Sequence, residues 1–80
     1  MRKTTFERVR AIASDVLGVP PGRIDERSSP EEFEDWDSIL QLNIVLALEQ
    51  EFDLQFEPEE MERMTNVGRM AALVDEKIGS

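Results

Sequence analysis

Ser38 is the side chain in this sequence with the clearest potential for chemistry. It follows Asp37 and opens a long apolar run in "EDWDSILQLNIVLALEQEF", residues 34 to 52. A serine hydroxyl is a weak nucleophile that needs a nearby base. The chain has no histidine and no cysteine, and Lys3 and Lys77 lie near its two ends. The protein is therefore not expected to be an enzyme with its own serine active site.

Two interpretations of Asp37-Ser38 remain. In the first the pair is structural, because Asp and Ser are preferred helix N-caps and replacing a cap costs about 1 kcal/mol. In the second another enzyme modifies Ser38 and supplies the missing base. A phosphate ester at Ser38 would lie at a helix N-terminus, where free N–H groups and the helix dipole favour an anion by about 0.3–1 kcal/mol. Asp37 would then serve as the helix cap or as a contact for the modifying enzyme.

The composition is that of one small domain, spanning residues 1–80. Apolar residues make up 40% of the chain, enough for a packed core, and a monomer is expected. The absence of cysteine excludes disulfides and thiolate zinc sites and fits a cytoplasmic location. No secretory signal is expected, and the segment from Ile39 to Leu48 is too short and interrupted to insert across a membrane. Without EF-hand spacing, no specific metal site is expected.

The charge is strongly acidic and unevenly distributed. The formal net charge is −9, and the segment from Ser28 to Glu62 contains 12 acidic residues and no Lys or Arg. Such a chain is not expected to bind nucleic acid, because Lys and Arg must neutralise the phosphates. The acidic segment is either a solvated surface or a field that steers basic partner proteins toward the middle of the chain.

The first third of the chain predicts a helix followed by a long connection. Thr4 and Glu7 have capping-box spacing, and apolar residues then recur with helical period. Gly18 and the Pro-Pro-Gly that follows end this helix. The connection, residues 18–37, is rich in Pro, Gly, Ser and acids, and we expect Ile24 and Phe33 to pin it to the core. Trp36 is expected to pack at the entrance of the next helix, and a partner contact is the alternative for it.

The rest of the chain predicts three more helices. The second runs from Ser38 to Phe52, a short third from Pro58 to Met64, and the last from about Val67, with Thr65 and Asn66 as N-cap residues. Their spacing predicts a set of core residues: Leu42, Val45, Leu48, Phe52, Val67, Met70, Ala71, Val74 and Ile78. The fold class is therefore all-α, a small four-helix bundle of three longer helices and one short one, with a long loop between helices one and two.

The second helix has more apolar residues than one face can bury. Ile39, Leu40, Ile44 and Leu46 lie outside the predicted core stripe. Some of these side chains must be exposed, and an exposed apolar patch indicates a docking surface. The residues that flank Ser38 along this helix are the candidates for partner binding: Ile39, Leu40, Asn43 and Leu46, with Glu49 at the edge.

Three segments together resemble the acyl carrier proteins. They are Asp37-Ser38-Ile39, "ALEQEFDLQF" at residues 47 to 56, and "MTNVGRMAALV" at residues 64 to 74. Asp-Ser alone is a weak signal. The three segments at these separations are a strong one, and the resemblance covers nearly the whole chain.

The resemblance implies a function as a carrier. Ser38 would hold 4′-phosphopantetheine, transferred from coenzyme A by a phosphopantetheinyl transferase that also recognises Asp37. The thiol of this arm would hold acyl or aminoacyl groups as thioesters. Partners would be the transferase, an acyl- or aminoacyl-loading ligase and downstream transferases.

The sequence also departs from the usual pattern of the family. Fatty-acid carriers commonly have acids in the first turns of the second helix, where this chain has Leu40 and Asn43. Ile39 replaces a usual Leu, Gln50 replaces an acid, and Trp36 replaces a small residue. These departures resemble specialised stand-alone carriers that serve a dedicated biosynthetic pathway. A second hypothesis is an acidic helical adaptor that carries no prosthetic group.

Overall fold

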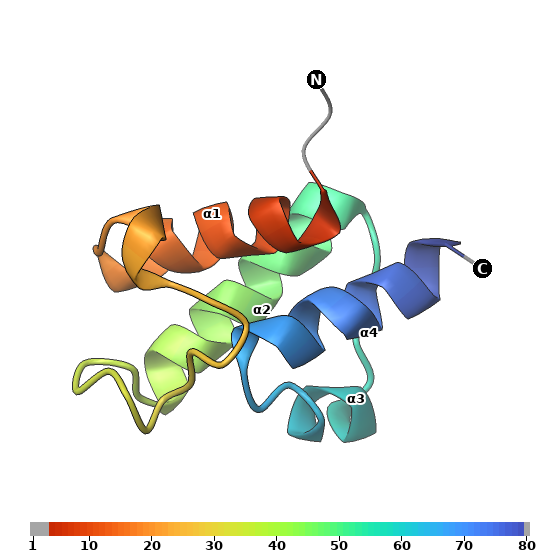
Figure 1. Ribbon diagram of the computed structural model, residues 1–80. Coiled ribbons are helices and arrows are strands. Elements are labelled where there is room, and N and C mark those ends of the chain that lie inside the picture. The colour runs from red at the N-terminus through yellow and green to blue at the C-terminus, as the bar shows by residue number, and fades with distance from the viewer. Residues whose placement is uncertain (1–3, 80) are drawn as a thin grey trace.

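The structure is a computed structural model that describes residues 4–79. Each regular element in this range is helical, in the order α1 (Thr5–Leu17), η1 (Pro21–Arg23), α2 (Ser38–Phe52), α3 (Pro58–Glu62) and α4 (Val67–Gly79) (Figure 1). The predicted all-α fold with four α-helices is confirmed, and η1, a 3-10 turn, is an addition. No helix in the described range is long and apolar enough to cross a membrane.

Local capping sets the bounds of α1. The Thr4 hydroxyl accepts a hydrogen bond from the Glu7 N–H at 3.1 Å, and the Glu7 carboxylate accepts one from the Thr4 N–H at 3.2 Å. At the other end Gly18 has φ +72°, a left-handed conformation that favours glycine, and its N–H donates to the Ser14 carbonyl. The helix therefore begins and ends where the sequence predicts.

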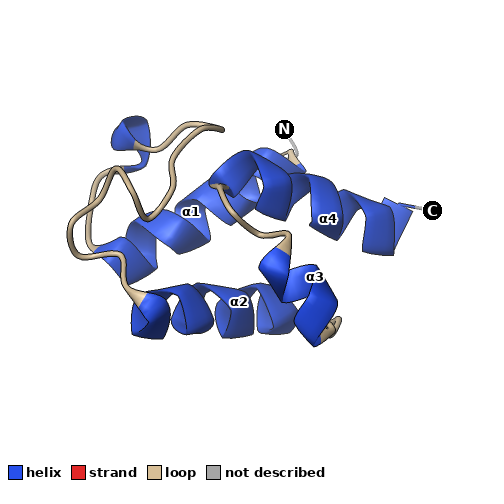
Figure 2. Cartoon of the chain, turned by 90° about the horizontal axis from the view of Figure 1, so that it is seen from below, coloured by secondary structure: helices blue, strands red, loops and turns tan. Residues whose placement is uncertain are grey.

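The core lies between α1, α2 and α4. α1 packs against both other helices, and Figure 2 shows α2 along one side of the molecule with α1 and α4 along the other. Burying each large aliphatic side chain stabilises the fold by about 1.5–3 kcal/mol. The fully buried hydrophobic side chains are Val9, Ala13, Ile44, Leu48, Val67, Met70 and Val74.

Two residues that we predicted in the core are exposed. Leu42 is 50% exposed and Ile78 is 46% exposed, whereas Ile44 and Leu73 are buried. In α2 the prediction is right for Val45 and Leu48 and wrong for Leu42, because this helix is apolar on nearly all sides and periodicity alone cannot select the buried face. Ile78 lies in the last turn of α4, which extends beyond α1 in Figures 1 and 2.

The connection between α1 and α2 is fastened to the start of α4. The carbonyls of Glu26 and Ser28 accept hydrogen bonds from the Gly68 and Val67 N–H groups at 2.9 and 3.0 Å. A Cβ at Gly68 would lie 2.9 Å from the Glu26 carbonyl oxygen, so a larger residue would push the connection away. Asn66, as predicted, caps α4 by accepting from the Arg69 N–H.

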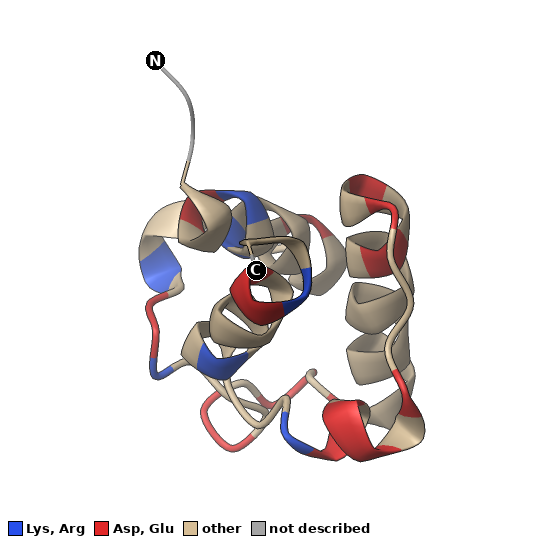
Figure 3. Cartoon of the chain, turned by 90° about the vertical axis from the view of Figure 1, so that its right-hand side faces the viewer, with Lys and Arg blue, Asp and Glu red and all other residues tan. Residues whose placement is uncertain are grey.

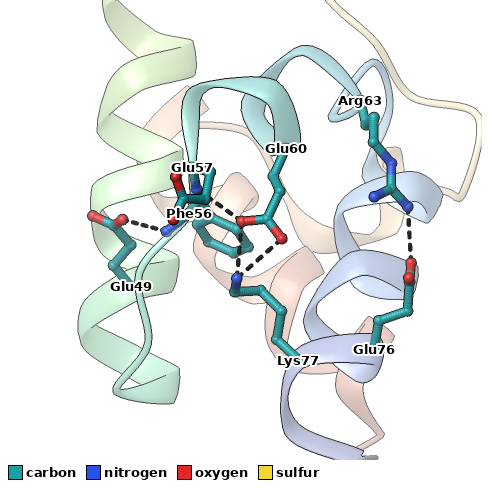
Figure 4. A network of polar contacts seen from close by, with 7 residues as sticks. All are labelled: Glu49, Phe56, Glu57, Glu60, Arg63, Glu76 and Lys77. Atoms are coloured by element: carbon teal, nitrogen blue, oxygen red, sulfur yellow. Dashed lines mark hydrogen bonds and ion pairs between the residues drawn. The ribbon is translucent and has the colours of Figure 1, made fainter.

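Polar contacts and the packing of Met61 against the core hold α3, which ends at Glu62 and is shorter than predicted. No residue within α3 is buried. The Glu60 carboxylate accepts from the Glu57 N–H at 2.8 Å and pairs with Lys77 of α4 at 2.8 Å, and Arg63 pairs with Glu76 at 3.0 Å (Figure 4). The N–H of Glu57 and the Lys77 ammonium hold the pKa of Glu60 below its ordinary value.

Candidate functional site

Ser38 is exposed at the first residue of α2, where the long connection ends. Asp37 is the N-cap, with extended backbone angles, and its Oδ1 accepts a hydrogen bond from the Leu40 N–H at 2.9 Å. Its main-chain carbonyl accepts from the Gln41 N–H at 2.9 Å. Asp37 thus fixes the first turn of α2, and Ser38 projects from the start of a well-formed helix.

Two backbone donors remain beside the Ser38 hydroxyl. Within residues 4–79 the N–H groups of Ser38 and Ile39 donate to no protein acceptor. Free N–H groups at a helix N-terminus favour an anionic group by about 0.3–1 kcal/mol. The start of α2 therefore suits a phosphate ester on Ser38, although the carboxylate of Asp37 opposes it slightly.

The chain supplies no catalytic group for Ser38. Histidine and cysteine are absent from the sequence, and no cluster of metal ligands occurs in the described part of the chain. The described residues therefore give the Ser38 hydroxyl neither a histidine base nor a metal centre.

An apolar stripe lies along the exposed side of α2, next to Ser38. Ile39 is 70% exposed, Leu42 50% and Leu46 46%, and the exposed Asn43 lies among them. Their spacing of three and four residues places them on one face of the helix. We call this set, Ile39, Leu42, Asn43 and Leu46, the exposed stripe. Leu42 was not among the residues predicted for partner binding, although its spacing from Ile39 and Leu46 places it on the same face of the helix.

Two residues predicted at the partner surface have other contacts. Leu40 is half-buried and packs against the core. Glu49 is half-buried, and its carboxylate accepts from the Phe56 N–H at 2.9 Å, which ties α2 to the segment before α3 (Figure 4). Both lie at the border of the exposed stripe.

The two sides of the molecule differ in charge. Figure 3 shows Lys and Arg on α1, α4 and their neighbouring connections, while α2 carries acidic side chains and no basic ones. Arg8 of α1 pairs with Glu51 of α2 at 2.9 Å, so one of these acids is neutralised within the protein. A partner that approaches the exposed stripe meets an apolar surface with acids nearby.

Fold and site together define a small helical protein with an exposed serine at the N-terminus of its second α-helix. A family model described as "Phosphopantetheine attachment site" matches residues 7–74, a range that includes Ser38. The chain belongs to this family, that of the acyl carrier proteins, which are carriers and not enzymes and whose cofactor is 4′-phosphopantetheine. Membership disfavours the adaptor hypothesis.

Relatives and solved structures agree with this assignment. The chain is 30% identical over 75 residues to an acyl carrier protein of Thermosynechococcus vestitus, covering 94% of this chain and 93% of that protein. Over 63 residues it is 36% identical to an acyl carrier protein of Clostridium acetobutylicum, covering 79% and 82%. A solution structure of holo acyl carrier protein from Geobacter metallireducens is 27% identical, with a TM-score of 0.84 over 94% of this chain and 86% of that one.

Proposed function

We propose that Ser38 is the residue to which 4′-phosphopantetheine is attached. The observation that carries this proposal is the exposed hydroxyl at the start of α2, next to two N–H groups that have no protein acceptor. In the transfer the Ser38 Oγ forms an ester bond with the phosphate of the arm, coenzyme A releases adenosine 3′,5′-bisphosphate, and the hydroxyl proton passes to a base of the transferase. The attached arm supplies a thiol, which holds acyl groups as thioesters.

Asp37 has two functions in this proposal. It caps α2 through its contact with the Leu40 N–H, and it is a recognition contact for the transferase. Because the residue next to Ser38 is a carboxylate, a basic side chain or a metal ion of the transferase would complement it.

The exposed stripe is the proposed surface for partner enzymes. Exposed Ile and Leu side chains at helical spacing gain free energy when a partner covers them, and they contribute little to folding. The partners in this proposal are the transferase, an acyl- or aminoacyl-loading ligase and downstream transferases. Leu42 joins the predicted set, whereas Leu40 contributes only its exposed part.

A specialised biosynthetic pathway is the setting that the first turns of α2 favour. Leu40 is apolar and Asn43 is neutral at positions where acids are common in fatty-acid carriers. Enzymes that recognise such a carrier by charge would lose an ion pair here. We therefore expect fatty-acid synthase enzymes to use this protein poorly, and efficient turnover by them would contradict the specialised setting.

Intact-mass measurement tests the attachment site. Wild type is incubated with coenzyme A and a broad-specificity phosphopantetheinyl transferase, beside Ser38→Ala and the control Ser29→Ala in the preceding connection. Wild type and the control should each gain the mass of one arm, and Ser38→Ala should gain none while retaining its helical circular dichroism. A gain of mass by Ser38→Ala, or none by folded wild type, would overturn the proposal.

A further inference from the structure

Trp36 is a buried residue in the connection just before Ser38. It is the one tryptophan of the chain, its side chain is 3% exposed, and its ring lies 6.1 Å from that of Phe33. Its indole N–H donates a hydrogen bond of 2.8 Å to the Gln41 side-chain oxygen. An indole N–H buried without such a partner would be costly, so this contact fixes Trp36 relative to α2.

Gln41 extends the contact across the molecule. Its side-chain nitrogen donates to the main-chain carbonyl of Met64 at 3.0 Å. The orientation of the amide is unambiguous, because the indole can only donate and the carbonyl can only accept. Met64 is buried and lies in the link between α3 and α4. The Gln41 side chain thus joins the end of the long connection and the start of α2 to the α3–α4 link, which lies 23 residues further along the chain.

The two residues bracket Ser38. Trp36 lies two positions before it and Gln41 lies three after it, on the half-buried side of the same first turns. Asp37 fixes the shape of this turn from within, but its contacts are all local. The relay from Trp36 through Gln41 to Met64 is the hydrogen-bonded path that sets where the turn lies relative to α3 and α4.

We propose that Trp36 and Gln41 are positioning residues for the modification of Ser38. They hold the Ser38 turn in one orientation relative to the α3–α4 link, so that a transferase contacting both regions meets the hydroxyl in a reactive position. The proposal rests on the proposed attachment at Ser38. Neither residue touches the reacting atoms, and each acts through the position of the turn.

Steady-state loading kinetics test this proposal. Trp36→Phe keeps a buried ring but removes the donor, and Gln41→Leu keeps the approximate volume but removes both hydrogen bonds. Gln55→Leu, at an exposed position outside α2, is the matched control. All are compared below their melting temperatures. Misplacement of a nucleophile lowers the chemical rate, so kcat should fall by about tenfold in both variants with KM changed less, while the control matches wild type.

Two further measurements separate positioning from simple stabilisation. If the two residues act through one relay, the double variant should load no more slowly than the worse single variant, since their effects are not additive. Hydrogen exchange at the amides of Leu40 and Gln41, which both donate to Asp37, should be faster in both variants at a temperature where each is folded. A stabilising role alone would lower the melting temperature and leave kcat unchanged.

The outcomes are distinguishable. If folded wild type gains no arm, the attachment proposal fails and this one falls with it. If wild type is loaded and Trp36→Phe and Gln41→Leu load within about twofold of it, only the positioning proposal is overturned. Should Gln41→Leu fail to fold, the kcat of Gln41→Glu replaces it in this comparison. The carboxylate of this variant still accepts from Trp36 but cannot donate to Met64.

Discussion

The two faces of α2 have almost the same side chains and opposite surroundings. Ile44, Val45 and Leu48 face α1 and the core and are buried, whereas the exposed stripe has Ile39, Leu42 and Leu46 in water. The apolar residues of the first face are explained by folding. Those of the second are not, because folding alone gains little from an exposed Leu or Ile. The same residue types therefore occur in the core and on the proposed docking surface, and only the neighbouring helices determine which face of α2 is buried.

The largest expected effect is on the buried face. Ile44→Ala should lower the free energy of unfolding by about 3 kcal/mol, because it removes buried contacts and leaves a cavity. Leu42→Ala, the matched truncation on the exposed face, should change it by less than about 0.5 kcal/mol. Chemical denaturation followed by circular dichroism measures both.

Equal losses of unfolding free energy in Ile44→Ala and Leu42→Ala would contradict the difference between the two faces of α2. They would mean that Leu42 is covered in solution, by a second copy of the chain or by another arrangement of α2. Measuring the unfolding midpoint at two protein concentrations would identify the first of these cases, since dimer stability rises with concentration.

The parts of this fold that depend on contacts between residues close in sequence could be predicted, and the parts that depend on contacts between distant residues could not. The capping box of Thr4 and Glu7 and the caps Asp37 and Asn66 bond to neighbours within three residues, so the sequence shows both partners. The starts of α1, α2 and α4 follow from them. The attachment candidate Ser38 is found in the same way, because the cap precedes it directly.

The buried face of α2 could not be derived from spacing. A helix with apolar residues on all sides buries the face that its neighbours select, and α1 and α4 are distant in sequence. The relay from Trp36 to Met64 and the close approach of Gly68 to the Glu26 carbonyl are non-local for the same reason. Leu42 was therefore assigned to the core, and Gln41 was not recognised at all.

The next largest effect tests whether partner enzymes dock on the exposed stripe. Leu46→Asp should lower the efficiency with which a partner enzyme uses the loaded carrier by about tenfold, because a charge replaces an apolar contact. Its melting temperature should stay near that of wild type, since the side chain is 46% exposed. Kinetics with the cognate loading enzyme measure the first, and thermal unfolding the second.

Gln50→Asp is the control for Leu46→Asp, because it adds the same charge to an exposed position of the same helix. If both variants lose activity equally, net charge explains the loss and the stripe does not. If neither does, partners do not dock on this face.

A smaller effect on stability and on loading is expected at Asp37, the N-cap of α2. Asp37→Ala removes the acceptor for the Leu40 N–H and should cost about 1 kcal/mol of stability. Asp37→Asn keeps the cap and removes the charge, so its stability should match wild type while loading of Ser38 slows. If Asp37→Asn is loaded at the rate of wild type, Asp37 is a helix cap and has no part in transferase recognition.

The smallest effect concerns α3, which adds ionic contacts to the packing of Met61 against the core, whereas α2 packs mainly through apolar side chains. Because the N–H of Glu57 and the Lys77 ammonium lower the pKa of Glu60, its carboxylate stabilises the fold above its ordinary pKa of 4.5. This contribution is lost as the pH falls through the lower pKa of the folded state. Glu60→Gln should therefore melt slightly below wild type at neutral pH, and the difference should disappear in acid. Glu59→Gln, at the exposed neighbouring position, is the control for the removal of one acidic side chain from α3. A difference that persisted in acid would mean that Glu60 stabilises α3 through packing, and α3 would then resemble the buried face of α2.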